Sequence, residues 1–266
     1  VEKKAATVSD IFWRKVGTDF AKTSTAMVGA GSIWPDRLKD YSPNEIYLRF
    51  GVCDADRSKI NAFSKALPAL ILAGPSGMAV STRGRPRPQQ VVAYWPALMR
   101  RDRIGAKVLT LDTAGRRTTK TIRFPVRGEV GEPVRSDEPR RRPAVFKAQG
   151  RTVEVPLRRL CYARSGDKGD MCNVGILARS TRVYAWMLSR LTATRVKKFF
   201  GDKVKGTVTR HELDNLEGLN FLLDESLGGG GTTSLLVDPQ GKTMSQALLE
   251  MKVRVPASLV RTVADS

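Results

Sequence analysis

The chain has 266 residues, a formal net charge of +20 and a hydrophobic content of 41%. Its length allows one large or two modest globular domains, and no apolar run approaches the roughly 20 residues that a membrane-spanning helix requires. The three cysteines (Cys53, Cys161 and Cys172) have no CxxC spacing, which argues against a disulfide framework and a zinc site and indicates a reducing compartment.

The first part of the chain predicts a mixed α/β region. Its pattern indicates, in chain order, a helix that begins near Ser9 or Asp10, a strand over 44–52, a helix over 57–67, a buried strand over 69–73 and a strand pair over 107–111 and 120–124. Residues 81–90 carry two Arg-Pro pairs, which predict an extended basic segment.

The second part predicts an α+β domain. The expected elements are strands over 153–163 and 173–179, a helix over 183–200, a strand over 207–213, a helix over 215–227, a short strand over 234–237 and a strand over 247–255. Strands that alternate with two helices predict a ferredoxin-like, two-layer sandwich with both helices on one face of the sheet.

The clearest domain boundary lies between these two parts. Residues 135–150 combine charged residues, two prolines and a run of three arginines, with little to bury. We therefore expect an N-terminal α/β region over 1–134, a basic linker over 135–150, a C-terminal domain over 151–257 and a tail over 258–266.

Most of the positive charge lies in the middle third of the chain. Residues 83–164 hold 21 Lys and Arg against 7 Asp and Glu, a net charge of +14. A solvated basic face is the plain alternative, but a charge of this size predicts an anionic partner: RNA, anionic lipid or an acidic protein. Arginine suits phosphate because its planar guanidinium binds two oxygens at once. The candidate nucleic-acid-binding residues are Arg83, Arg85, Arg87, Arg100, Arg101, Arg103, Arg116, Arg117, Arg140, Arg141 and Arg142.

Two other residue types limit the chemistry. His211 is the only histidine, and nothing near it in sequence suggests a Ser-His-Asp or Cys-His catalytic set. The four tryptophans are too dispersed for a base-stacking platform, so we expect RNA to be bound mainly through its backbone phosphates.

The most informative segment is 163–179, where glycines and charged residues lie between two apolar runs. It predicts a tight loop after a strand, because glycine and aspartate favour turns. In a functional site, Lys168 would hold an acidic group, an aspartate would act as acid, base or metal ligand, and an asparagine would orient a carbonyl. In a purely structural segment, the same residues would only fix the turn. The candidate catalytic residues are Ser165, Asp167, Lys168, Asp170, Asn173 and Asn220, with Gly228, Gly229, Gly230 and Gly231 as a ligand loop.

Several segments resemble the acyclic terpene utilisation (AtuA-like) family. The C-terminal resemblance covers about 153–257 and rests on Ala163–Asp170, Asn173–Gly175, Leu219–Leu222, Leu227–Gly230, Ser234-Leu235, Asp238 and Gln240–Lys242. A looser one covers about 44–90, through Gly74-Pro75, Gly77 and the Arg-Pro pairs. The resemblance implies a ferredoxin-like C-terminal domain after a reduced form of the family's larger N-terminal domain, and an activity on terpenoid or branched acyl-CoA substrates.

The sequence leaves three hypotheses for function. The first is a non-catalytic accessory subunit of a mitochondrial ribonucleoprotein (the mitochondrial ribosome or an assembly intermediate) in the matrix, which contacts rRNA phosphates and neighbouring proteins through the arginines. The second is an enzyme or enzyme subunit of acyclic terpene or branched acyl-CoA catabolism, as the resemblance implies. The third is an accessory subunit of a respiratory complex. We expect no cofactor and no metal site, and the C-terminal domain offers a surface for homo-oligomers.

Overall fold

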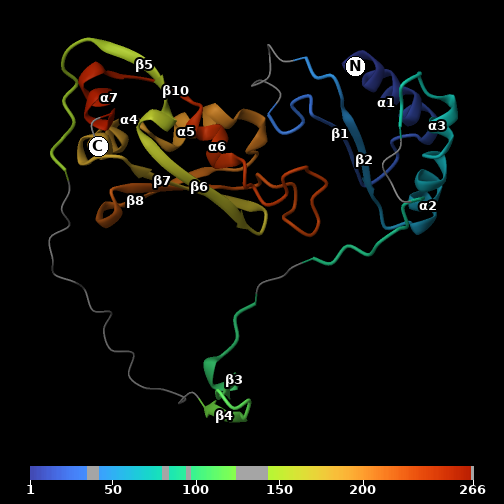
Figure 1. The fold of residues 1–266 in the computed structure, drawn as a ribbon, viewed down its shortest axis with the longest axis horizontal. Coiled ribbons are helices and arrows are strands. Elements are labelled where there is room, and N and C mark those ends of the chain that lie inside the picture. Colours follow the sequence, from blue (N-terminus) through green and yellow to red (C-terminus); the bar gives the residue numbers. More distant parts are fainter. Residues whose placement is uncertain (35–41, 80–83, 94–96, 124–142, 265–266) are drawn as a thin grey trace. The chain divides into compact units, whose positions relative to one another are not determined.

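The computed structural model describes residues 1–34, 42–79, 84–93, 97–123 and 143–264 (Figure 1). The chain divides into two compact units, one formed by Val1–Ala93 with Arg141–Ser266 and the other by Tyr94–Arg140. Among the described residues, no helix has the length and apolar character needed to cross a membrane.

The N-terminal elements of the first unit build a small aromatic core. They are α1 (Glu2–Val16), β1 (Lys22–Val28), β2 (Tyr47–Cys53), α2 (Arg57–Ala66) and α3 (Ala69–Ala73), with β1 and β2 antiparallel. Phe12 and Phe63 are buried at the centre of this core with Val8 and Leu70.

Sequence patterns predicted these N-terminal elements in part. The strand over 44–52 and the helix over 57–67 are confirmed as β2 and α2, and the Asp56 side chain caps α2 by accepting from the Ser58 N–H. The first helix begins at Glu2, earlier than expected. The buried strand predicted over 69–73 is wrong, because Pro68 takes helical backbone angles and starts the short helix α3.

The C-terminal part of the first unit is built on a four-stranded antiparallel sheet of order β6-β7-β9-β8. Its strands are β6 (Cys161–Lys168), β7 (Met171–Ala178), β8 (Val208–Leu213) and β9 (Gly218–Leu223). Three helices pack on one face of this sheet: α4 (Thr181–Arg190), α5 (Ala193–Phe200) and α6 (Met244–Leu249) (Figure 1). The α+β fold class and the two-layer arrangement are thereby confirmed, but the helix predicted over 215–227 is wrong, because residues 218–223 pair with β7 and β8 as strand β9.

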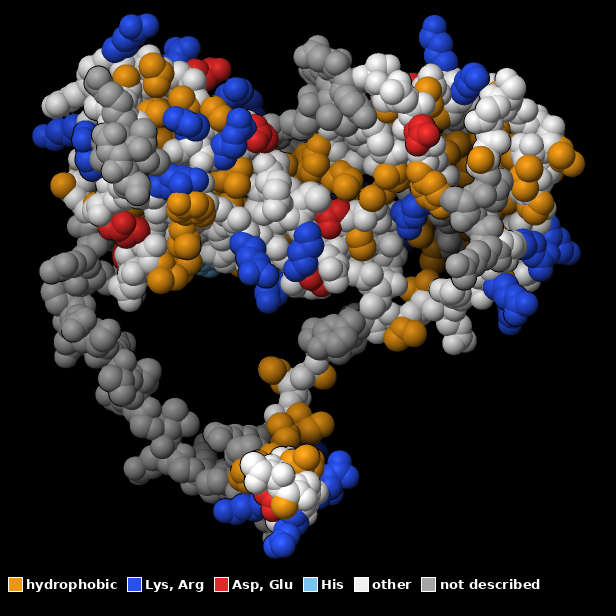
Figure 2. All heavy atoms as spheres, in the orientation of Figure 1, with side chains coloured by type: hydrophobic (Ala, Val, Ile, Leu, Met, Phe, Trp, Pro, Cys, Tyr) orange, Lys and Arg blue, Asp and Glu red, His pale blue; other side chains and the backbone are white. Residues whose placement is uncertain are grey.

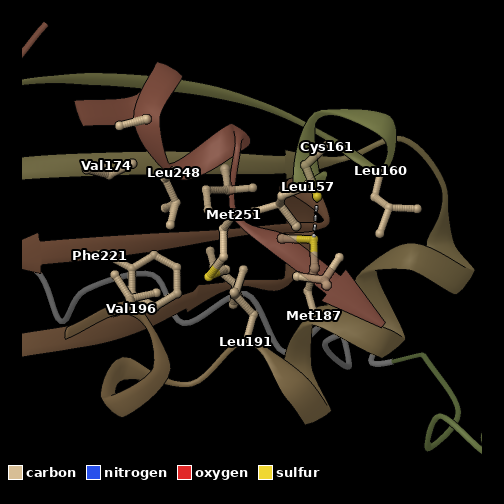
Figure 3. Packing of buried hydrophobic residues seen from close by; sticks show 14 of the residues in the cluster. Leu157, Leu160, Cys161, Val174, Met187, Leu191, Val196, Phe221, Leu248 and Met251 are labelled. Carbon is tan, nitrogen blue, oxygen red and sulfur yellow. Dashed lines mark hydrogen bonds between the residues drawn. The ribbon is translucent and has the colours of Figure 1, made fainter. Parts of the chain in front are cut away.

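The main core lies between the sheet and these helices. Val174 from β7 and Phe221 from β9 are fully buried there against Met187 and Leu248 (Figure 3). Ile176 from β7 is fully buried in the same core. Since side chains alternate across a strand, every second residue of β7 and β9 enters this core and the intervening residues lie on the other face of the sheet.

A second strand pair and a short helix complete the first unit. Strand β5 (Thr152–Pro156) pairs antiparallel with β10 (Lys252–Pro256), and α7 (Ala257–Ala264) follows. Short 3-10 turns connect the elements of this part: η3 (Leu157–Arg159), η4 (Gly201–Lys203) and η5 (Asp214–Leu216).

Several expectations for this part are wrong in detail. The single strand over 153–163 is two strands, β5 and β6, separated by η3. The helix over 183–200 is broken after Arg190, since Thr192 caps a new helix by accepting from the Arg195 N–H. The strand over 247–255 is α6 followed by β10, and residues 234–237 form no strand.

The second unit contains a β-hairpin. Strands β3 (Gly105–Leu111) and β4 (Arg117–Arg123) pair antiparallel after the 3-10 turn η2 (Arg101–Arg103), which confirms the predicted strand pair through residue 123. The Asp112 carboxylate fixes the connecting turn by accepting from the Ala114 and Arg116 N–H groups. Of the expected linker, residues 135–142 lie outside the described part of the chain.

Candidate functional site

The charged segment 163–170 forms an edge strand and a tight turn. Lys168 pairs with Met171, so Gly169 and Asp170 alone make the turn between β6 and β7. Gly169 has a φ of +67°, which a two-residue hairpin turn needs and which glycine adopts without strain. The loop predicted between the strands over 153–163 and 173–179 is therefore wrong for residues 165–168, which belong to β6. Their alternation places Ser165 and Asp167 toward the helices.

Asp170 fastens this turn to the glycine run 228–231. Its Oδ1 accepts from the Gly229 N–H at 2.7 Å and from the Leu227 N–H at 3.2 Å, and its carbonyl accepts from the Ser226 N–H at 3.1 Å. A Cβ added to Gly230 would lie only 2.9 Å from the Gly169 carbonyl oxygen, so the two segments touch backbone to backbone. Asp170 thus has a structural role, and its Oδ1 is already occupied.

Ser165 joins β6 to the start of α6. The residue is 5% exposed, and its hydroxyl donates to the Gly241 carbonyl at 2.6 Å and accepts from the Ser245 N–H at 3.0 Å. Because its proton and one lone pair are committed to these partners, Ser165 is not arranged as a nucleophile.

Asp238 organises the turn that leads into α6. Its two carboxylate oxygens accept from the Lys242 N–H at 3.0 Å, the Thr243 N–H at 2.7 Å and the Thr243 hydroxyl at 2.6 Å. The Trp34 indole N–H donates to the same hydroxyl at 3.1 Å. Sequence reasoning gave Asp238 no role of its own, since its partners become evident only once the turn is folded.

The remaining candidates do not all converge with Ser165 and Asp170. Asn173 and Asn220 lie on the sheet face opposite the helices, on the adjacent strands β7 and β9. Lys168 is exposed at the end of β6, and Asp167 is half-buried, 3.7 Å from the position that a Cβ on Gly231 would take. The structure therefore brings Asp167 and Asp170 to the glycine run and separates them from the two asparagines.

Among the described residues of the first unit, two cavities have volumes typical of small-molecule sites. The larger, of about 740 Å³, is bordered by Asp170, Gly228 and Gly229 together with Lys22, Lys205 and Trp34. The smaller, of about 480 Å³, lies among the N-terminal elements and is mainly apolar. Sequence reasoning predicted neither, because their walls come from segments far apart in the chain.

The buried cysteines are unsuited to nucleophilic chemistry at neutral pH. Burial raises the pKa of Cys161 to about 12 and that of Cys172 to about 11, so both thiols stay protonated. The Cys161 thiol lies 3.5 Å from the Met187 sulfur inside the core (Figure 3). No cluster of His, Cys, Asp or Glu suited to a metal ion occurs among the described residues.

The candidate arginines lie on both units. Arg83, Arg140, Arg141 and Arg142 fall outside the described residues, and Arg101 is described only as part of η2. The others are exposed: Arg85 and Arg87 in the first unit, and Arg100, Arg103, Arg116 and Arg117 in the second, where Figure 2 shows Lys and Arg side chains around the hairpin. Arg100 also pairs with Asp102, at 2.5 Å.

Two family models match the chain, one on each side of the central basic region. Residues 1–110 match the family described as acyclic terpene utilisation family protein AtuA, and residues 155–254 match the AtuA ferredoxin-like domain. The chain belongs to the AtuA family. The N-terminal match to this family is longer than the segment 44–90 that the sequence motifs indicated. No curated protein and no solved structure matches the chain significantly.

Proposed function

We propose that this chain serves acyclic terpene or branched acyl catabolism, as an enzyme subunit that binds a branched apolar acid or its acyl derivative. The observation that carries the proposal is the 480 Å³ apolar cavity in the N-terminal elements. The description of the AtuA family names acyclic terpenes, which are branched apolar chains.

The cavity suits such a ligand in size and chemistry. Its volume lies within the roughly 300–1,000 Å³ of small-molecule sites. Val8, Phe50 and Ile71 contribute to its apolar lining, and Lys4 and Arg85 supply positive charge for an acidic head group. The Lys4 ammonium donates to the Ser76 carbonyl at 3.1 Å, whereas the Arg85 side chain is exposed, so Arg85 is the better partner for a carboxylate.

Calorimetric titration with a branched ten-carbon terpenoid acid tests this proposal. Ile71→Asn should weaken binding, because it places an amide in the apolar wall. Leu72→Asn is the matched control, because Leu72 is 93% exposed and does not border the cavity. Arg85→Ala should weaken binding of the acid but not of the corresponding alcohol. Equal binding by the Ile71 and Leu72 variants, or no binding by the wild type, would contradict the proposal.

A second candidate function is favoured by the basic hairpin of the second unit. Exposed Arg103, Arg116 and Arg117 surround it, and its apolar strand residues Leu109 and Leu111 are 51% and 65% exposed. Such a surface suits the phosphates of RNA, with exposed side chains left for a neighbouring protein. We therefore retain the accessory subunit of a mitochondrial ribonucleoprotein in the matrix as an alternative proposal.

Sedimentation of the native protein from gently lysed cells, with and without RNase, tests this alternative. Co-sedimentation with ribosomal particles that RNase abolishes would support it. A light peak that RNase does not shift would exclude it, and binding to anionic vesicles instead would favour an accessory subunit of a respiratory membrane complex.

A further inference from the structure

One face of the C-terminal sheet is left uncovered by the helices. Its side chains come from alternate residues of the four strands, and the register places Arg164, Gly175, Asn220 and His211 side by side in one row across it. We define the open face as these four residues with their neighbours Tyr162, Gly166, Lys168, Met171, Asn173, Leu177, Thr209, Leu213, Gly218 and Leu222.

The open face is positively charged and rich in hydrogen-bonding groups. It contains Arg164 and Lys168 but no aspartate or glutamate. The Lys242 ammonium adds a further charge at the edge of β6, where a Cβ on Gly166 would lie 3.0 Å from it. Asn173 and Asn220 present amides between these charges.

The open face also carries an exposed aromatic ring. Tyr162 is 56% exposed, and the Arg179 guanidinium packs over its ring at 3.8 Å and donates to its hydroxyl at 2.6 Å. A ring fixed in this way can stack a nucleobase on its free side with little loss of side-chain entropy. Gly175 in this row leaves room for a flat group near the sheet backbone, since a Cβ there would have no neighbour closer than 3.8 Å.

We infer that the open face binds single-stranded nucleic acid, with a base stacked on Tyr162, phosphates on Arg164, Lys168 and Lys242, and base edges within reach of Asn173 and Asn220. An open antiparallel sheet with basic and aromatic side chains suits unstacked bases, which a duplex does not offer. The inference rests on the second candidate function, since it specifies how such a chain would recognise RNA. It also differs from the expectation of phosphate contacts alone, because Tyr162, rather than a tryptophan, supplies the stacking group.

Fluorescence anisotropy with a labelled 20-nucleotide oligouridylate tests the open face. Tyr162→Ala should weaken binding about 5-fold or more, the lower range for loss of one base–aromatic stack. Tyr162→Phe keeps the ring and should bind nearly as the wild type does. Arg164→Ala should weaken binding and lower the salt dependence of binding. Arg182→Ala, which changes another exposed arginine, on α4, should do neither.

The outcomes separate this inference from the function on which it rests. One result would be that the Tyr162 and Arg164 variants bind RNA as the wild type does while the Arg116→Ala, Arg117→Ala double variant does not bind. That result would overturn RNA binding at the open face and keep RNA binding at the basic hairpin. Absence of RNA binding at low salt would overturn both. Equal affinity for duplex and single-stranded RNA would also overturn single-strand recognition at this face. Displacement of RNA by an acidic peptide of matched charge would do the same, because it would show that charge alone decides binding.

Discussion

Replacing Ser165 by alanine should destabilise the C-terminal domain strongly. The substitution removes the hydroxyl of a residue that is 5% exposed and leaves the Ser245 N–H without this partner, whereas the Gly241 carbonyl still accepts from the Met244 N–H at 3.3 Å. The Ser245 N–H belongs to the first turn of α6, whose cap residue Thr243 makes no side-chain capping bond, so Ser165 acts as a cap from another element. Leaving one buried polar group unsatisfied predicts a loss of about 1–3 kcal/mol.

Urea denaturation followed by circular dichroism measures this loss. It should appear as a lower midpoint at unchanged slope, and it would be a large part of the roughly 5–15 kcal/mol that stabilises a typical domain. Ser189→Ala is the control, because the Ser189 hydroxyl is exposed and bonds only within α4; its effect should stay within about 0.5 kcal/mol. If Ser165→Ala were as stable as the wild type but lost ligand binding, the structural role argued for Ser165 would be refuted.

Three further predictions follow from the same region. Asp170→Asn should loosen the glycine run by weakening the bonds to the Leu227 and Gly229 N–H groups, visible as faster hydrogen exchange at Gly229 and unchanged exchange in α4. Gly241→Ala should lower the free energy of unfolding in urea by about 1–3 kcal/mol, because φ is +63° and the new Cβ would lie 2.6 Å from the Cys172 sulfur. Gly150→Ala is the control: φ is also positive there but the space around it is open, so this variant measures backbone strain without the clash. The thiols of Cys161 and Cys172 should resist iodoacetamide at pH 8 until the protein unfolds, because burial raises their pKa from 9.0 to about 12 and about 11. Above pH 9 these thiols ionise in the unfolded chain first, so the free energy of unfolding should fall as the pH rises. Fast labelling of either native thiol would contradict this prediction.

The sequence predicted those elements whose pattern fits one periodicity, such as α2 with its Asp56 cap and the hairpin of β3 and β4. It failed for β9, which it predicted as part of a helix over 215–227. Leu219, Phe221, Leu222 and Leu223 form an apolar run that suits a helix or a strand equally well. Pairing with β7 on one side and β8 on the other decides for the strand, and those partners are distant in sequence.

The candidate site could be predicted as a set of residues but not as an arrangement. The composition of the segment 163–170 singled it out, yet the partner of Ser165 on α6 lies 80 residues further along the chain. Local composition indicates that glycine and aspartate make turns. It does not show whether a carboxylate in such a turn remains available or accepts from a distant backbone N–H, as Asp170 does from Gly229.

The family's most recognisable residues in this chain have structural partners. Ser165, Asp170 and Asp238 each bond to backbone groups between β6, the glycine run and α6, so their chemistry is used to hold the domain together. The groups that remain available lie elsewhere, in the apolar cavity near Ile71 and on the open face around Asn173. Because these two places are built from different elements, substitutions can abolish one and leave the other intact, and the two proposed functions can be judged separately in the same protein.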